Sequence, residues 1–266
     1  MSDDPGNLIR AAKQLIETER LFGADFLPAR RNPLPEEASQ QGAMSAVGMR
    51  NGEEHADEGG AAPRMTPQQK AAALNELDAS EVRPCSRCGL RAGCGQTVFG
   101  EGNPDAALVF VGEGPGAEED RQGRPFVGQA GELLTKMIAA MGLRRQDVYI
   151  CNIVKCRPPG NRTPMPDEVA ACIGHLIRQL EIIRPKVIVA FGNPATQNLL
   201  NTKVGITRLR GLWQKLPILG EGLGGTPVMP TFHPAFLLRQ YTQDHRQKVW
   251  DDLQKVMDLL GLKKRR

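Results

Sequence analysis

The chain has 266 residues, 40% of them hydrophobic and 24% charged, with a formal net charge of +4. This composition is typical of a globular protein, and no apolar run approaches the ~20 residues of a membrane helix, so collagen-like and membrane-spanning classes are excluded. The charge is uneven, because residues 1–84 hold 9 Lys/Arg against 14 Asp/Glu, whereas residues 85–266 hold 25 against 16. We expect the basic second part to be the working domain with a polyanionic partner, although a solvated basic surface explains the same numbers.

The first 84 residues are expected to hold one helix and a linker. Apolar residues recur at helical spacing near the start, which predicts an amphipathic helix in residues 1–27, packed on the domain or on a protein partner. Residues 28–84 are rich in Pro and Gly, which indicates a mostly disordered linker with a further helical stretch at residues 67–77. The acidic start lacks the apolar segment of a signal peptide, so a cytoplasmic location is expected.

Short aliphatic runs alternate with helical patterns in residues 85–262, ahead of a basic tail at residues 263–266. Alternating strands and helices indicate an α/β fold in which helices cover both faces of a parallel sheet. We therefore predict a three-layer α/β/α sandwich around a central four-stranded parallel sheet. The predicted strands are residues 107–111, 148–153, 186–191 and 226–232, and the main predicted helices are residues 131–141, 166–184 and 244–260.

Ligands of such sheets bind beyond the carboxyl ends of the strands, so the segments that follow the four runs form the candidate site. The first segment, Gly112 to Ala117, matches the G-x-G-x-x-A fingerprint of dinucleotide-binding folds. Two features argue against a dinucleotide, because Pro115 removes a backbone donor and the acidic residues directly after the loop repel a pyrophosphate. The other three segments contain Asn152, Gly192 and His233.

Six cysteines in a chain of this kind indicate metal ligands or core thiols rather than disulfides. The candidate ligands are Cys85, Cys88, Cys156 and Cys172. Four thiolates without histidine suit either tetrahedral zinc or a 4Fe–4S cluster, and spacing does not separate the two. Cys172 also fits the buried face of its predicted helix, and Cys94 is an alternative ligand, whereas Cys151 lies inside a predicted strand and is expected in the core.

Four motifs occur in order along the second part of the chain. They are GEGPG, ED and GRPFVG within residues 112–128, NIVKCRPP at residues 152–159, GIT and RG within residues 205–211, and FHPA at residues 232–235. Together they resemble the type 4 uracil-DNA glycosylases, and the similarity spans about residues 85–260. The resemblance implies an α/β/α sandwich with a four-stranded parallel sheet, and a 4Fe–4S cluster on the four candidate cysteines.

The resemblance also implies an activity. A monomer of this family hydrolyses the bond between uracil and deoxyribose in single- or double-stranded DNA, which leaves an abasic site for base excision repair. The alternative is a non-catalytic Fe–S nucleic-acid-binding protein of the same fold. A related branch that traps uracil-DNA covalently carries a basic, His-bearing insertion in its active-site loop. Residues 159–164 of this chain read PGNRTP, so that activity is disfavoured.

Base recognition is expected to depend on three side chains within these motifs. An enzyme that acts on a base in DNA flips the base out of the stack, and Phe126 is the expected stacking partner of the flipped uracil. Asn152 is expected to accept from N3–H and to donate to O4, and cytosine reverses both groups, which leaves a buried mismatch. Glu119 is the candidate for excluding the methyl group of thymine.

Catalysis is expected to depend on the first and last motifs. His233 is expected to donate to O2 of the base, where negative charge develops as the bond breaks. The attacking water is expected beside the main chain of Gly114 and the carboxylate of Glu113. Because an oxocarbenium-like sugar needs little deprotonation of that water, whether Glu113 is a true general base stays open.

Residues around these loops are candidates for contact with DNA. The candidate phosphate contacts are Lys155, Arg157, Arg162 and Arg210, which would position the strand without reading its sequence. Leu237 and Leu238 are candidates for a wedge that fills the position vacated by the base, or alternatively for the buried face of a helix.

Overall fold

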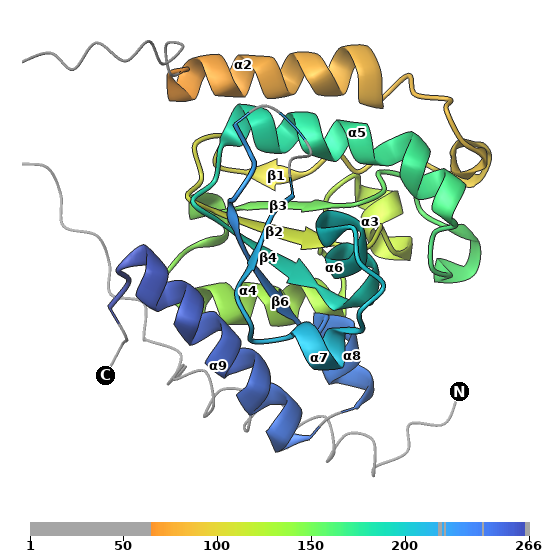
Figure 1. The fold of residues 1–266 in the computed structure, drawn as a ribbon. Coiled ribbons are helices and arrows are strands. Elements are labelled where there is room, and N and C mark those ends of the chain that lie inside the picture. Colours follow the sequence, from red (N-terminus) through yellow and green to blue (C-terminus); the bar gives the residue numbers. More distant parts are fainter. Residues whose placement is uncertain (1–64, 218–219, 221, 241, 264–266) are drawn as a thin grey trace, which may run out of the picture. The chain divides into compact units, whose positions relative to one another are not determined.

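The computed structural model describes residues 65–217, 220, 222–240 and 242–263 of the chain. The predicted N-terminal helix, the linker up to residue 64 and residues 264–266 of the basic tail lie outside the described residues. Figure 1 shows a central sheet with helices on both of its faces. The predicted three-layer α/β/α architecture is therefore confirmed.

Within the described residues, six strands form one sheet in the order β1-β3-β2-β4-β6-β5. They are β1 (Glu101–Gly102), β2 (Leu108–Gly112), β3 (Tyr149–Asn152), β4 (Val187–Phe191), β5 (Gln214–Lys215) and β6 (Pro227–Thr231). β3, β2, β4 and β6 are parallel and correspond to the four predicted strands, whereas β1 and β5 pair antiparallel at the two edges. The sequence does not predict the edge strands, because two residues are too short to show any periodicity.

The inner parallel strands are buried on both faces. Every residue of β2 and of β4 is buried, and the rings of Phe110 and Phe191 stack with their centroids 5.5 Å apart. A continuous apolar run, rather than an alternating one, is what a strand covered on both faces requires. The continuous apolar runs that predicted these strands are therefore explained by the burial of both faces of the sheet.

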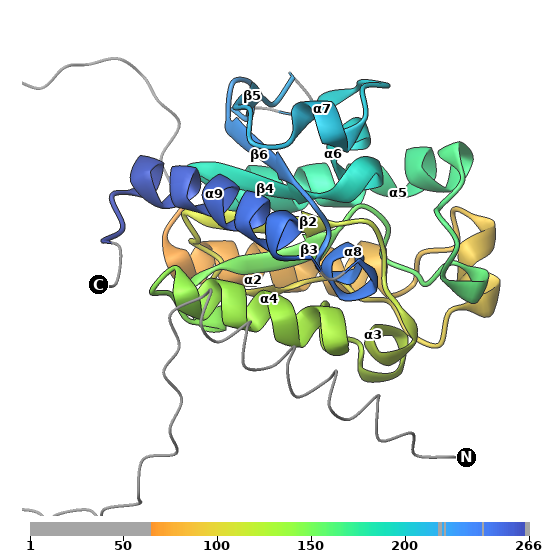
Figure 2. The same ribbon diagram turned by 90° about the horizontal axis from the view of Figure 1, so that it is seen from below.

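Helices cover both faces of the sheet (Figures 1 and 2). The first face is covered by α2 (Pro67–Leu77), α5 (Pro166–Ile183) and α6 (Gly192–Leu200), and the second by α4 (Gln129–Ala140), α8 (Pro234–Arg239) and α9 (Gln243–Leu260). Two short helices follow carboxyl-end loops, namely α3 (Ala117–Gln122) and α7 (Ile206–Leu209). A π-helical turn spans Asp78–Val82, and 3-10 turns span Gly89–Gly93, Arg145–Asp147 and Pro159–Asn161.

Residues 67–82 belong to the domain rather than to a linker. Leu74 and Leu77 are buried in the same hydrophobic cluster as the inner face of α5, and Lys70 donates from Nζ to the carbonyl of Ile183 at 2.7 Å. The linker boundary predicted at residue 84 is therefore wrong. The helix predicted at residues 67–77 is confirmed by α2, but its packing against α5 joins residues about a hundred positions apart, which no local pattern reveals.

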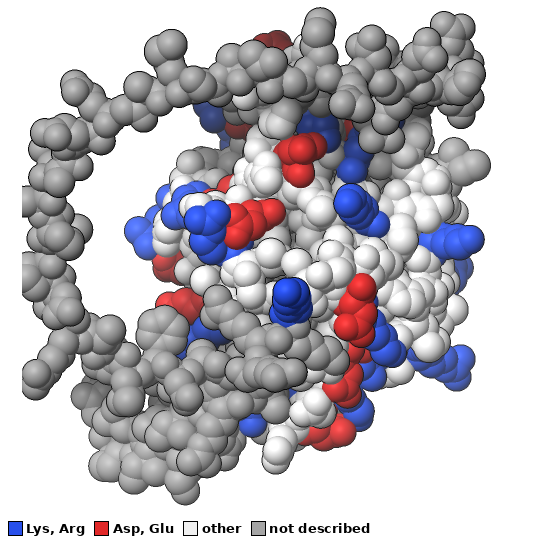
Figure 3. All heavy atoms as spheres, turned by 90° about the vertical axis from the view of Figure 1, so that its left-hand side faces the viewer, with Lys and Arg blue, Asp and Glu red and all other residues white. Residues whose placement is uncertain are grey.

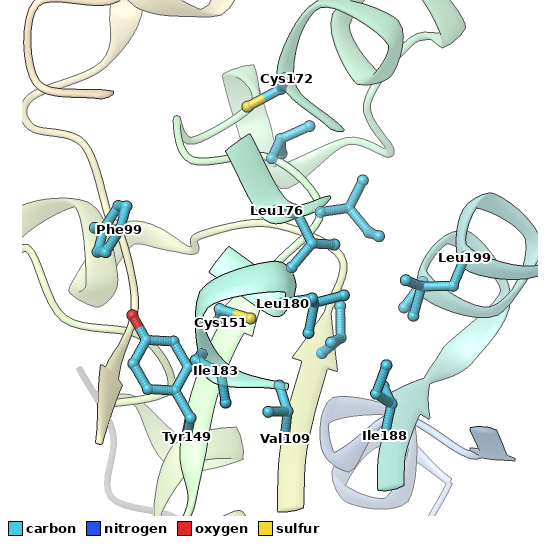
Figure 4. Close-up of a cluster of buried hydrophobic side chains, with 14 of the residues drawn as sticks. Phe99, Val109, Tyr149, Cys151, Cys172, Leu176, Leu180, Ile183, Ile188 and Leu199 are labelled. Carbon is cyan, nitrogen blue, oxygen red and sulfur yellow. The ribbon is translucent and has the colours of Figure 1, made fainter. Parts of the chain in front are cut away.

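The hydrophobic cluster between the sheet and α5 contains the thiol of Cys151 (Figure 4). Its side chain is fully buried and belongs to the same cluster as Leu180 of α5 and Val109 of β2, which Figure 4 labels. Burial also raises the pKa of this thiol, so Cys151 stays neutral as a core side chain does. The predicted core position of Cys151 is confirmed.

None of the described helices combines the length and the apolarity that a membrane span requires. Figure 3 shows the face at the amino-terminal ends of the parallel strands, where Lys and Arg are interspersed with Asp and Glu. Positive charge does not gather into one patch on the visible part of this face. The candidate site lies at the opposite, carboxyl-terminal edge of the sheet.

Candidate active site

One cavity of about 800 Å³ lies where the parallel strands end. Its walls come from the segments that follow β2, β3, β4 and β6, as expected for an open α/β sheet. The structure brings to this cavity all of the residues predicted for base recognition and catalysis, namely Glu113, Gly114, Glu119, Phe126, Asn152 and His233. Asn152 and His233, which come from separate strands, therefore share one hollow.

The glycine at the end of β2 allows Asn152 and Phe126 to meet. Gly112 pairs with Asn152 across the two parallel strands. A Cβ at Gly112 would lie 2.3 Å from Oδ1 of Asn152 and 2.6 Å from Cζ of Phe126, which no side chain could occupy. The first glycine of the loop thus allows the amide of Asn152 and the ring of Phe126 to pack closely against the main chain.

Phe126 is held in an unusual backbone conformation. Its φ is +51°, in the left-handed region that bulky residues rarely adopt, and its side chain is only 6% exposed. A Cβ at Gly131 of α4 would lie 1.8 Å from the carbonyl oxygen of Phe126, so only glycine permits this helix to close on the loop. Strain of this kind persists where the surrounding structure fixes a functional side chain.

His233 is a neutral hydrogen-bond donor toward the cavity. Its Nδ1 accepts from the backbone N–H of Ala235 at 3.0 Å, so the proton of the neutral ring is on Nε2. Burial, reinforced by the charge of Arg239, lowers the pKa of His233 to about 4. The imidazole lies 5.5 Å from the ring of Phe126, centroid to centroid, with the two planes 25° apart.

Glu113 is the titratable group of the glycine loop. Burial raises the pKa of its carboxyl, and a hydrogen bond from Thr163 and the charge of Arg239 oppose that shift. The backbone carbonyl of Glu113 accepts from Val154 at 3.1 Å, which ties the glycine loop to the segment that follows Asn152.

Glu119 ties two loops of the cavity wall together. Its Oε1 accepts from the backbone N–H groups of Val127 and Gly128 at 2.9 and 3.1 Å, and its Oε2 accepts from Gly116 at 3.1 Å. These bonds hold the segment that carries Phe126 against the start of α3. Glu119 lines the cavity, and its contact with the methyl group of thymine stays a prediction.

Three of the predicted DNA contacts are wrong. Lys155 is 1% exposed, and its Nζ donates to the carbonyl of Asn152 at 2.9 Å and to Oε1 of Gln179. Arg210 binds the buried carboxylate of Asp252, and its side chain is only 18% exposed. Leu237 is fully buried in the core, so it is not a wedge. Residue type and a position beside a loop do not reveal whether a side chain points into the core or toward solvent.

The remaining predicted contacts lie at or near the surface. Arg162 is exposed, lines the cavity and forms a two-point ion pair with Glu168 at 2.8 and 2.6 Å. Arg157 is partly buried and donates from Nε to Asn161 at 2.8 Å. Leu238 is partly buried against the second-face cluster. The sequence did not indicate Arg239, an exposed residue that lines the cavity six positions after His233.

The four candidate cysteine ligands line a second, small cavity together with the buried Lys155. Two come from the segment before Leu90, one from the loop after β3 and one from α5. The backbone N–H of Lys155 lies 3.3 Å from Sγ of Cys172, and Nδ1 and Nε2 of His175, at the same cavity, are buried without a partner. Among the described residues no three His, Cys, Asp or Glu side chains are arranged to hold a single metal ion.

Cys94 lies next to the ligand set but outside the small cavity. Its thiol contacts that of Cys156, and its Sγ also lies 3.0 Å from the carbonyl of Gln96. Cys156 and Cys172 are buried, and burial raises the pKa of Cys172, so a thiolate at this position requires compensating positive charge. Lys155 and the arginines Arg87 and Arg91 line the cavity and supply such charge.

Comparison with known proteins identifies the family. Residues 99–254 match the model of the uracil DNA glycosylase superfamily. The chain is 50% identical to a type-4 uracil-DNA glycosylase of Thermotoga maritima, over 70% of this chain and 95% of the relative. It is 44% identical to those of Archaeoglobus fulgidus, over 69% and 92%, and of Saccharolobus solfataricus, over 71% and 87%. The chain therefore belongs to the uracil DNA glycosylase superfamily and, within it, to the type-4 group.

Proposed function

We propose that the chain is a uracil-DNA glycosylase of base excision repair, which hydrolyses the bond between uracil and deoxyribose and leaves an abasic site. The observation that carries the proposal is the convergence of Phe126, Asn152 and His233 on one cavity. An aromatic ring, a side-chain amide and a neutral imidazole supply the stacking, the base reading and the charge stabilisation that the reaction needs. The names of the relatives state the same activity for those proteins.

Recognition begins when the uracil leaves the base stack, because its reacting atoms are out of reach inside a duplex. The ring of Phe126 then stacks on the extruded base. The amide of Asn152 accepts from N3–H and donates to O4, and both groups are reversed in cytosine. Asn152 is 2% exposed, so a cytosine would leave two mismatched polar groups away from water, a state that discriminates strongly.

Bond cleavage leaves negative charge on the departing uracil. His233 lines the cavity, and because its Nδ1 is already used as an acceptor, Nε2–H is the donor that the neutral ring can offer. A neutral imidazole donates this hydrogen bond to O2 without having to lose or gain a proton. Such a fixed donor acts most strongly where charge develops in a site that excludes water.

The attacking water is placed by the glycine loop in this proposal. Glu113 and Gly114 line the cavity on the β2 side, whereas His233 comes from the end of β6. The carboxylate of Glu113 orients the water, and it accepts a proton once the oxocarbenium-like sugar has been attacked. Glu119 and the loops that it holds are proposed to leave no room for the methyl group of thymine.

A 4Fe–4S cluster is proposed on Cys85, Cys88, Cys156 and Cys172, with zinc as the alternative. The donor set suits a cluster, because four thiols meet at one cavity and positive side chains line it. When bound, the group supplies a cross-link between the segment before Leu90, the loop after β3 and α5. A purified protein with visible absorption, iron and acid-labile sulfide supports the cluster, whereas a colourless zinc protein contradicts it.

Other parts of the proposal concern DNA and the cell. Arg157 and Arg162 are proposed to contact phosphates of single- or double-stranded DNA, and Leu238 is the remaining candidate for a wedge. A monomer in the cytoplasm is proposed, with a protein partner for the N-terminal segment, residues 1–27.

The decisive assay uses the full chain and matched oligonucleotides that differ only in one base. Incubation followed by alkali is expected to cut the strand at uracil and to leave thymine and cytosine strands intact. The variant His233→Ala is expected to lose most of this activity, whereas Leu212→Ala, at an exposed position outside the cavity, is the control. Binding of uracil-DNA without strand scission would favour the non-catalytic alternative.

A further inference from the structure

The cavity continues past the uracil-reading residues to a cluster of three aromatic rings. Phe232, Phe236 and His245 all line it, and their ring centroids lie 4.8, 5.6 and 5.0 Å apart in the three pairs. Phe232 is 7% exposed and packs against both of the other rings. Phe236 and His245 are partly exposed, so they present aromatic surface to the same space into which the flipped base would enter.

The two partly exposed rings are held in place by helix starts. Phe236 lies in the first turn of α8, three residues after His233, and both residues line the cavity. His245 lies in the first turn of α9, where its backbone N–H donates to Thr242 Oγ1 at 3.2 Å. Its Nδ1 lies 3.4 Å from the carbonyl of Gln240, which further restricts the ring. A ring fixed before binding loses little entropy when a base stacks on it.

A cation completes this end of the cavity. Arg239 follows Phe236 by three residues and is exposed at the cavity, and its charge reaches both Glu113 and His233. No carboxylate among the described residues forms an ion pair with it. An unpaired guanidinium beside a catalytic pocket suits a phosphate group, which it can bind through two parallel hydrogen bonds.

We propose that Phe236, His245 and Arg239 form a second subsite, which takes the nucleotide next to the uracil in the same strand. The neighbouring base stacks on Phe236 and His245, and the phosphate that joins the two nucleotides binds Arg239. The subsite rests on the proposed uracil-DNA glycosylase function and extends it to the flanking nucleotide. Stacking tolerates any sequence, because every base offers an aromatic face. We therefore expect the subsite to require a base but to accept any of the four.

The competing explanation is a purely structural brace between α8 and α9. A brace stabilises the fold but does not respond to the substrate next to the uracil. The test therefore varies the flank on both sides of the uracil in short single-stranded oligonucleotides, which carry adenine, thymine or a base-free sugar at that position. Initial rates give kcat/KM, and fluorescence anisotropy gives the affinity for the same strands.

Phe236→Leu keeps apolar volume but removes the aromatic face, and Trp213→Leu, at an exposed position outside the cavity, is the matched control. We expect wild type to bind strands with a flanking base roughly 5- to 100-fold better than Phe236→Leu does. That ratio is expected to fall to near one on strands whose flanking sugar is base-free. An equal loss on both kinds of strand, or no loss on either, overturns the stacking subsite.

Arg239→Gln tests the phosphate contact at a position too exposed to endanger folding, with Lys215→Gln at the edge strand β5 as the control. The plot of log affinity against log salt concentration is expected to become shallower by about one phosphate contact for Arg239→Gln alone. An unchanged slope overturns this part of the proposal. Absence of uracil release by the wild type, with the flank dependence of binding intact, would reject the glycosylase function while leaving the subsite standing.

Discussion

The depressed pKa of His233 predicts how the free energy of unfolding changes with pH. The folded chain binds a proton at His233 only near pH 4, whereas the unfolded chain does so near 6.5. Between these values the unfolded state binds more protons, so stability falls as the pH falls from 6.5 to 4 and the full penalty is present below pH 4. At 1.36 kcal/mol per pH unit the penalty reaches about 3 kcal/mol, and about 2 kcal/mol of it is present at pH 5.

The variant His233→Gln removes this titration, since an amide does not bind a proton in that range. Urea denaturation of both proteins at four pH values, roughly 7.5, 6.5, 5.5 and 5, gives the free energy of unfolding of each protein as a function of pH. The difference between the profiles is expected to change by about 2 kcal/mol between pH 7.5 and 5, with wild type losing more. Parallel profiles would refute the conclusion that His233 is desolvated and neutral, and with it the assignment of Nε2–H as a preformed donor.

Three further predictions follow from the geometry. Glu113→Gln is expected to remove an acidic limb of the kcat/KM profile, because the raised pKa of Glu113 makes wild-type activity fall as the pH drops through it; a limb that persists in the variant assigns it to another group. Asn152→Asp is expected to lower kcat/KM for uracil about 10- to 100-fold and to increase release of cytosine, measured on matched strands. An unchanged ratio of kcat/KM for uracil to kcat/KM for cytosine contradicts the role of the amide. Leu237→Ala is expected to cost about 2–5 kcal/mol of stability in urea, since Leu237 is fully buried; loss of uracil release at full stability would restore the wedge.

The sequence was sufficient for the parallel strands and for the location of the site. The inner strands β2 and β4 are continuous apolar runs that are buried on both faces, and a run of this kind is visible without any tertiary information. The carboxyl ends of the parallel strands lie at one edge of the sheet, so Asn152 and His233 were expected at the same edge, and both line the cavity there. The edge strands escaped prediction because their register depends on β3 and β6, not on their own two residues.

The direction of individual side chains could not be read from the sequence. Lys155 and Arg157 stand two residues apart in one motif, yet Lys155 is buried and Arg157 reaches toward the surface. Arg210 was predicted to contact phosphate, but its guanidinium forms an ion pair with the fully buried carboxylate of Asp252. Such pairings join residues more than forty positions apart, and no local pattern records them.

The burial of Lys155 explains why Asn152, the proposed base-reading residue, and Cys156, a candidate ligand, belong to one short motif. Its Nζ donates to the carbonyl of Asn152, and its backbone N–H points to Sγ of Cys172. Gln179 of α5 accepts from the same ammonium and donates from Nε2 to Phe99 and Tyr149, at 2.9 and 3.2 Å. An ammonium group withdrawn from water must keep these acceptors in place, because losing one leaves a buried charge without compensation. Lys155 therefore links the small cysteine cavity to the end of β3, and the group proposed on the cysteines would also hold the backbone that carries Asn152.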